Sequence, residues 1–331
     1  MELVKIKMGT SLFYYLYIVI CIGVFLGLYF LLRKKSRKVQ YWTLFSVLAF
    51  NFALHFIKLA FPQYTGFPAV IRKSTFENIC AVSTMIFPFI FISKSKAGKD
   101  YMFYLGLVSG IAGCVAPMPV ASMNLAFYEP ETMRYYICHA SIWQIPLLMV
   151  LFGIHTLDYR RIWKTFVIYF LVLGVIMINE LILIRIGWVG TGSLEEFFDA
   201  NERDMGYAVG LPDAMQGAAK YVLWLTPKAW KDPYVPILWE LFPVIILGGA
   251  AAFAVSMIWE HEHFKKDMIW LKGKTVEVYG IAKVKVPQFF AKVKGLFSRN
   301  KQEDAQKPVV NESTPEEQTL PETDKSETEN D

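Results

Sequence analysis

Residues 11–38, SLFYYLYIVICIGVFLGLYFLLRKKSRK, decide the fold class. The first 22 residues of this stretch are predominantly apolar, which matches the roughly 20 residues that an α-helix needs to cross a bilayer. Five of the six residues that follow are Lys or Arg. A cleaved signal peptide would instead end in small residues. The run is therefore predicted to stay in the protein as a membrane helix.

Composition extends this interpretation to the whole chain. Of its 331 residues, 54% are hydrophobic and only 19% are charged, which argues against a soluble globule with a water-facing surface. Seven apolar runs are long enough to cross a membrane. They are residues 11–32, 41–61, 77–94, 101–118, 136–156, 165–185 and 234–259. We therefore predict an all-α, polytopic membrane helix bundle with seven transmembrane helices.

Basic residues predict the orientation of this bundle. The connections that follow the first, third and fifth runs contain eleven Lys and Arg, against five in the short segments on the opposite side. Cytoplasmic loops of membrane proteins carry an excess of Lys and Arg. The N-terminus is accordingly expected outside and the C-terminus inside.

The prediction divides the chain into three parts. Residues 1–260 form the transmembrane domain, with an extracytoplasmic loop over 186–233 whose aromatic residues favour a lid or an interfacial segment. Residues 261–299 mix lysines with aromatic and aliphatic residues, which is typical of a segment lying on an anionic membrane surface. Residues 300–331 hold ten acids, three lysines and no aromatic residue, which predicts a disordered cytoplasmic tail.

Several kinds of chemistry find no support in the sequence. The four cysteines are scattered singly, so neither a disulfide framework nor a zinc site is predicted. The stretch EHEH, residues 260–263, is expected to end the last helix rather than to bind a metal, and no cofactor is expected. Membrane topology explains the basic residues, so nucleic acid is not an expected partner.

The polar residues within the predicted helices fall at one depth. Ionisable groups inside a membrane are costly, so they normally face the bundle interior and pair with one another or line a water-filled cavity. Ten such residues lie in the outer part of the predicted helices. They are His55, Lys58, Glu77, Asn78, Cys80, His139, Gln144, Asn179, Glu180 and Glu240. We interpret them as the lining of an outward-facing polar cavity, in which Lys58 and Glu180 compensate each other's charge.

Four stretches of the sequence resemble the YwaF-like integral membrane proteins, a bacterial group related to the eukaryotic transmembrane protein 164. They are ENIC (77–80), YYICHASIW (135–143), GVIMINELI (174–182) and NERDMGYAVGLPD (201–213), and the likeness covers roughly residues 10–260. The resemblance implies a multi-pass protein of the bacterial cell membrane. It matches Cys80 and His139 to a Cys and a His of the family, with Asn78 in place of a further His. The eukaryotic relatives are associated with cysteine-dependent acyl transfer between lipids.

Three functions stay open at this point. The first is binding or transport of a small-molecule or lipid ligand, with the seven polar residues other than Asn78, Cys80 and His139 as its contacts. The second is a membrane-embedded acyltransferase or lipid hydrolase, with Cys80 as nucleophile, His139 as base and Asn78 as orienting residue or oxyanion donor. Cys138, beside His139, is an alternative thiol. The third is a non-catalytic scaffold whose polar groups fasten helices together. Membrane lipids are the expected partners in each case.

Overall fold

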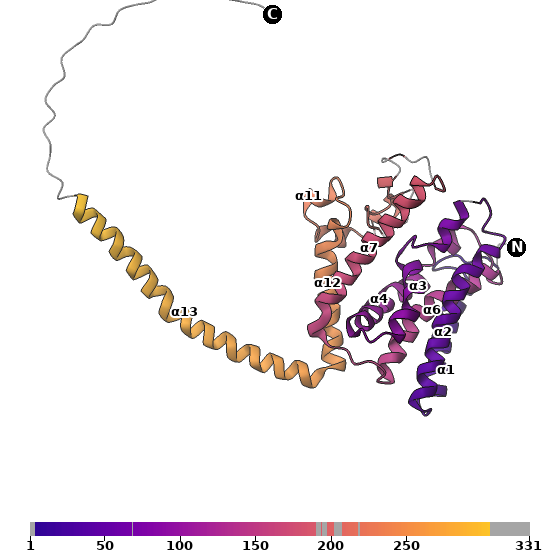
Figure 1. The fold of residues 1–331 in the computed structure, drawn as a ribbon, viewed down its shortest axis with the longest axis horizontal. Helices are drawn as coiled ribbons and strands as arrows, with labels where there is room; N and C mark the ends of the chain where they lie inside the picture. The colour runs from indigo at the N-terminus through magenta and orange to yellow at the C-terminus, as the bar shows by residue number, and fades with distance from the viewer. Residues whose placement is uncertain are drawn as a thin grey trace, which may run out of the picture. The chain divides into compact units, whose positions relative to one another are not determined.

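The computed structural model of the protein describes residues 4–67, 69–189, 193, 197–201, 207–217 and 219–304. Over this part of the chain the fold is all-α, with isolated bridges as its only β-structure, which confirms the predicted class. The chain divides after Phe264 into two units. The helices are drawn in Figure 1. Those of the first unit are α1 (Leu12–Leu32), α2 (Arg37–Ile57), η2 (Lys58–Ala60), η3 (Ala69–Ser74), α3 (Ile79–Ile92), α4 (Lys96–Val115), α5 (Met118–Ser122), α6 (Pro130–Leu151), η4 (Tyr159–Arg161), α7 (Ile162–Arg185), α9 (Asp213–Gln216), α10 (Lys220–Trp224), α11 (Lys228–Lys231), η5 (Leu238–Glu240) and α12 (Leu241–Trp259).

Five helical stretches in the described chain are long and apolar enough to cross a membrane. They are Leu12–Leu32, Arg37–Ala60, Lys96–Ser122, Tyr159–Arg185 and Leu238–Trp259. The predicted runs 77–94 and 136–156 correspond to α3 and α6, which are not among the five. α3 has only 14 residues. α6 has 22 residues, but 16 of them are buried, so other parts of the protein rather than lipid surround it and its surface does not need to be apolar.

Capping side chains set the helix ends, which therefore differ from the limits of the apolar runs. The Ser36 hydroxyl accepts a hydrogen bond from the Val39 amide at 3.4 Å and starts α2. The Ser95 hydroxyl accepts from the Gly98 amide at 3.0 Å, so α4 begins five residues before the predicted run. A side-chain cap of this kind satisfies an amide that has no partner within the helix. Helices here begin inside charged segments that hydropathy assigns to connections.

α4 packs closely on α6, the helix at the centre of the bundle. A Cβ atom added at Gly106 would lie 2.5 Å from the Ile142 carbonyl oxygen, and one at Gly113 would lie 2.0 Å from His139 Cδ2. Small residues let two helix backbones approach each other in a membrane protein. This contact fixes α6 and the polar side chains that it carries.

The connection between α7 and α12 packs on the bundle in its described parts. Phe197, Ala208 and Val209 are buried in the same apolar cluster as Val82 and Ile176. The predicted loop therefore covers part of the bundle. Its residues 190–192, 194–196, 202–206 and 218 lie outside the described chain.

The second unit contains most of α13 (His261–Asp304), a helix of 44 residues. From Lys265 to Lys292 its side chains are exposed, apart from the half-buried Asp267. Of the predicted acidic tail, residues 305–331 lie outside the described chain.

Candidate functional site

The segment between α2 and α3, residues 58–78, gathers charged groups at the C-terminal end of α2. Glu77 is buried, and its carboxylate lies 3.0 Å from Lys73 Nζ and 3.9 Å from Lys58 Nζ. Lys58 is buried as well. Because an isolated buried charge is very costly, these contacts explain how both groups are tolerated.

Tyr64 connects Lys58 to α6. Lys58 Nζ lies 5.8 Å from the centroid of the Tyr64 ring, and the Tyr64 hydroxyl donates to Glu131 Oε1 at 2.7 Å. Glu131 accepts two hydrogen bonds from the Arg134 guanidinium, at 2.6 and 2.5 Å, which is the strong bidentate arrangement. Burial, with the nearby charge of Glu131, raises the pKa of the Tyr64 phenol, so Tyr64 acts as a neutral donor. We call this set the α2–α6 polar network; its members are Lys58, Tyr64, Lys73, Glu77, Glu131 and Arg134.

Two buried polar atoms next to this network lack a hydrogen-bond partner within the described chain. They are Asn51 Oδ1 and His55 Nε2, from residues four apart and therefore on one face of α2. That face is turned to α6, since Asn51 Nδ2 donates to Ser141 Oγ at 2.7 Å. Leaving a buried polar group unpaired costs about 1–3 kcal/mol. The site thus holds unused capacity for hydrogen bonds.

A thiol also faces this site. Arg134 Nη1 lies 3.5 Å from the Sγ atom of the buried Cys138, one turn further along α6. A neighbouring cation stabilises the thiolate form of a cysteine. The structure thus places a cation beside the Cys138 thiol.

Residues 58–78 also hold α7. Arg72 Nε lies 3.1 Å from the fully buried carboxylate of Glu180, and Asn179 Nδ2 donates to Thr75 Oγ1 at 3.0 Å. The prediction that Lys58 compensates Glu180 is therefore wrong. Arg72 belongs to a connection that hydropathy leaves outside the bundle, so the sequence alone could not show that it turns inward.

The three residues of the acyltransferase hypothesis lie on α3 and α6. Asn78 caps α3, with its Oδ1 accepting from the Ala81 amide at 2.9 Å, and Cys80 is half-buried in the first turn. His139 Nδ1 lies 2.9 Å from the Tyr135 carbonyl oxygen, and the two rings stack with centroids 4.0 Å apart. The imidazole is held against Gly113 of α4.

The last two predicted ligand contacts make their hydrogen bonds elsewhere in the bundle. Gln144 Nε2 donates to the Cys21 carbonyl oxygen of α1 at 2.8 Å. The Glu240 carboxylate accepts from the Tyr169 hydroxyl of α7. Of the ten predicted residues, Lys58 and Glu77 thus belong to the α2–α6 polar network, whereas Gln144 and Glu240 connect other pairs of helices.

A second buried cluster, which the sequence analysis missed, is centred on Asp100. His155 Nε2 lies 2.7 Å from Asp100 Oδ1, and Arg161 Nε lies 2.6 Å from Asp100 Oδ2. Asp100 is fully buried, although it follows two lysines in a segment predicted to be a connection. His155 and Arg161 also line a cavity of about 510 Å³, together with Trp259 and His263. Among the described residues, no group of three His, Cys, Asp or Glu side chains is arranged to hold a metal ion.

Comparison with known proteins places the chain in a family. The profile of the TMEM164 family matches residues 7–191, more than half of the chain. The chain belongs to the TMEM164 family. With five long apolar helices in its described part, this TMEM164-family chain is a multi-pass membrane protein. The match includes the whole α2–α6 polar network and the Asp100 cluster, and ends before α12. No curated protein and no solved structure matches the chain.

Proposed function

We propose that this TMEM164-family protein binds the polar head of an amphipathic ligand, a lipid or a small molecule, at the α2–α6 polar network. The observation that carries the proposal is the pair of unpartnered buried atoms, Asn51 Oδ1 and His55 Nε2. A ligand group that donates to one and bonds the other removes the cost of leaving them unpaired. The network contains three cations and two acids, so its excess positive charge favours an anionic or strongly accepting headgroup.

We also propose that the protein belongs to the YwaF-like branch and lies in a bacterial cell membrane with its N-terminus outside. The bias of Lys and Arg in the connections supports this orientation. In this orientation the α2–α6 polar network and the connection between α7 and α12 face the outer side, and the basic residues of α13 contact the inner membrane surface.

Cysteine labelling in a background without the four native cysteines tests the orientation. A thiol reagent that does not cross membranes should label Asn201→Cys in intact cells. It should label Ser36→Cys only after the cells are opened, because Ser36 lies in the connection between α1 and α2. Labelling of both variants in intact cells contradicts the orientation.

The ligand proposal is tested by lipids retained through purification. Wild type and His55→Phe are extracted in a mild detergent, and the bound lipids are quantified by mass spectrometry. We expect His55→Phe to retain about five- to ten-fold less of the specific ligand, which corresponds to one lost hydrogen bond. Thr165→Val is the matched control, since the buried Thr165 hydroxyl of α7 also lacks a partner in the described chain but lies far along the sequence from the network. Equal retention by wild type and His55→Phe refutes the proposal.

A second candidate function is acyl transfer through a thiol. The resemblance to the eukaryotic relatives favours Cys80 as nucleophile, whereas the contact between Arg134 and Sγ favours Cys138. In either case a thiolate would attack a lipid ester carbonyl, form a thioester and release the lysolipid alcohol, and a second alcohol would then accept the acyl group. An acyl-transfer probe should lose its label in Cys80→Ala or in Cys138→Ala, and this identifies the nucleophile. Undiminished labelling in both variants contradicts the enzymatic function.

A further inference from the structure

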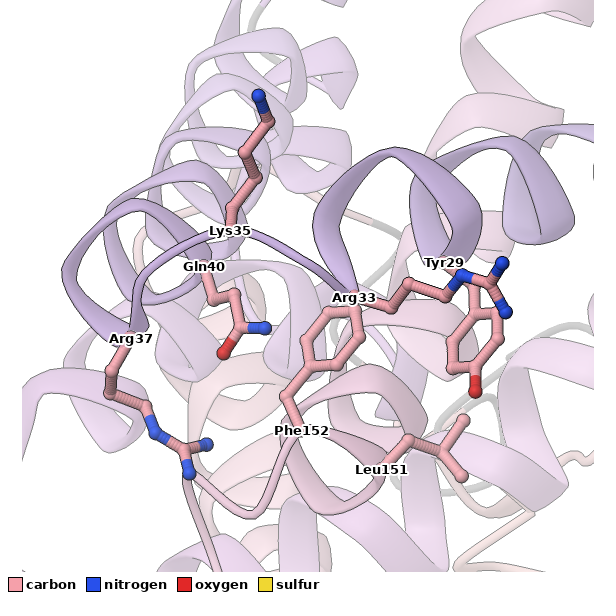
Figure 2. A pocket seen from close by; sticks show the side chains of 7 residues that line it. All are labelled: Tyr29, Arg33, Lys35, Arg37, Gln40, Leu151 and Phe152. Carbon is pink, nitrogen blue, oxygen red and sulfur yellow. The ribbon is translucent and has the colours of Figure 1, made fainter.

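A basic pocket lies at the opposite end of α2 from the α2–α6 polar network. It has a volume of about 460 Å³, and its lining comes from the turn between α1 and α2 and from the end of α6. The lining residues are Tyr29, Arg33, Lys35, Arg37, Gln40, Leu151 and Phe152. Figure 2 shows Arg33 and Arg37 on either side of the Phe152 ring, with Gln40 between Phe152 and α2. The function proposed above does not use this site.

The cations of this pocket have no acidic partner in the described chain, in contrast to the cations that stabilise the buried acids of the bundle. Lys58, Arg72, Arg134 and Arg161 each lie within 4 Å of a carboxylate. Within the part of the chain that the structure describes, Arg33, Lys35 and Arg37 form no ion pair. Three positive charges around one hollow create a potential that attracts an anion.

The two arginines are exposed, and each contacts a neighbouring group. Arg33 Cζ lies 4.7 Å from the centroid of the Phe30 ring, a cation–π contact. The Arg37 guanidinium lies over Gly153, where an added Cβ would be 3.5 Å from Nη2. Gly153 has φ +65° and ends α6, so a glycine is needed there for the turn as well.

Apolar surface lies directly beside these charges. The Tyr29 and Phe152 rings stack with centroids 6.0 Å apart, and Leu151 continues this surface along α6. The pocket also lies between the ends of α1 and α2, both of which are apolar enough to cross a membrane. A ligand that matches this pocket has a phosphate or similar anion attached to a hydrocarbon part.

We propose that this pocket binds the phosphate group of an anionic phospholipid from the adjoining leaflet. The arginines contact the phosphate oxygens, for which the planar guanidinium has matching geometry. Tyr29, Leu151 and Phe152 contact the glycerol and the first part of the acyl chains. Basic pockets between membrane helices are suited to anionic headgroups in this way.

The test compares binding of phosphatidylglycerol with that of phosphatidylcholine to the full-length protein in neutral detergent, by native mass spectrometry. Wild type should bind phosphatidylglycerol more tightly, and Arg33→Gln/Arg37→Gln should weaken this binding about ten-fold or more. Lys34→Gln/Lys38→Gln removes two charges from the same connection without touching the pocket lining. This control should keep most of the affinity. The melting temperatures of the lysine and arginine variants, measured without lipid, show whether both variants are folded.

Three results would overturn the proposal. Equal binding of the two lipids by the wild type would remove the requirement for a net negative headgroup. Equal losses in the arginine and lysine variants would show that diffuse surface charge, rather than the pocket, attracts the lipid. Displacement of phosphatidylglycerol by millimolar inorganic phosphate would show that a soluble phosphate rather than a lipid is the ligand.

Discussion

Arg72 and Glu180 are expected to contribute to stability as one unit, and the two single variants are expected to differ. Arg72→Met leaves the Glu180 carboxylate fully buried beside a methionine, and loss of one partner from a buried ion pair costs about 3–5 kcal/mol. Glu180→Gln leaves Arg72 without its acidic partner. The Arg72 side chain is 15% exposed and can turn part of its guanidinium to water, so a loss of about 1–2 kcal/mol in stability is expected. The double variant should therefore be more stable than the sum of the single losses predicts.

Reversible denaturant titration in mixed micelles measures this coupling. Residues in contact couple by roughly 0.5–3 kcal/mol, whereas separated residues add within about 0.5 kcal/mol. Lys58→Met combined with Glu180→Gln is the control cycle, because Lys58 lies against Glu77 instead. Strict additivity for Arg72 and Glu180, or a strong coupling between Lys58 and Glu180, would refute the pairing described above.

Two further predictions concern the middle and the other end of the bundle. Asp100→Asn should lower stability by about 3 kcal/mol, because His155 and Arg161 lose their shared acceptor. Asp158 is half-exposed and also pairs with Arg161, so Asp158→Asn should lower stability by less than about 0.5 kcal/mol. Equal losses of stability in Asp100→Asn and Asp158→Asn would contradict this expectation. Gly113→Ala should destabilise by about 1–3 kcal/mol, because its methyl group meets the His139 ring, and adding His139→Ala should restore part of the stability. Thermal unfolding measures both, and no loss in Gly113→Ala would contradict the close approach of α4 to α6.

The sequence was sufficient to predict helices and their approximate places, because a membrane requires long apolar segments with internally satisfied backbones. It was least informative for helices that other helices surround. α6 contains Glu131 and Arg134 within its first two turns; Glu131 accepts hydrogen bonds from both Arg134 and Tyr64. A hydropathy scale treats charged residues as unlikely to be buried, although pairing with each other allows these two residues to be buried.

The candidate site was predicted in part, for a similar reason. His55, Lys58 and Glu77 were recognised as costly polar groups, and the structure places Lys58 against Glu77. Their partners Tyr64 and Lys73, and the Arg72 that holds Glu180, lie in a connection whose path no periodic pattern defines. Asp100 was missed because a charge beside lysines at a helix start is usually solvated, and only the position of Arg161 shows otherwise.

The shortness of α3 has a consequence for the surrounding lipid. Its 14 residues rise about 21 Å, against a hydrocarbon thickness of about 30 Å. Polar backbone and charged side chains of residues 58–78 occupy the missing depth, so lipid tails beside α3 must shorten or tilt to avoid them. We therefore expect the bilayer to be thinner beside α3. Headgroups in such a thinned region would lie closer to Cys80 and the α2–α6 polar network, so a lipid would cross less hydrocarbon to bring its polar end to the protein interior.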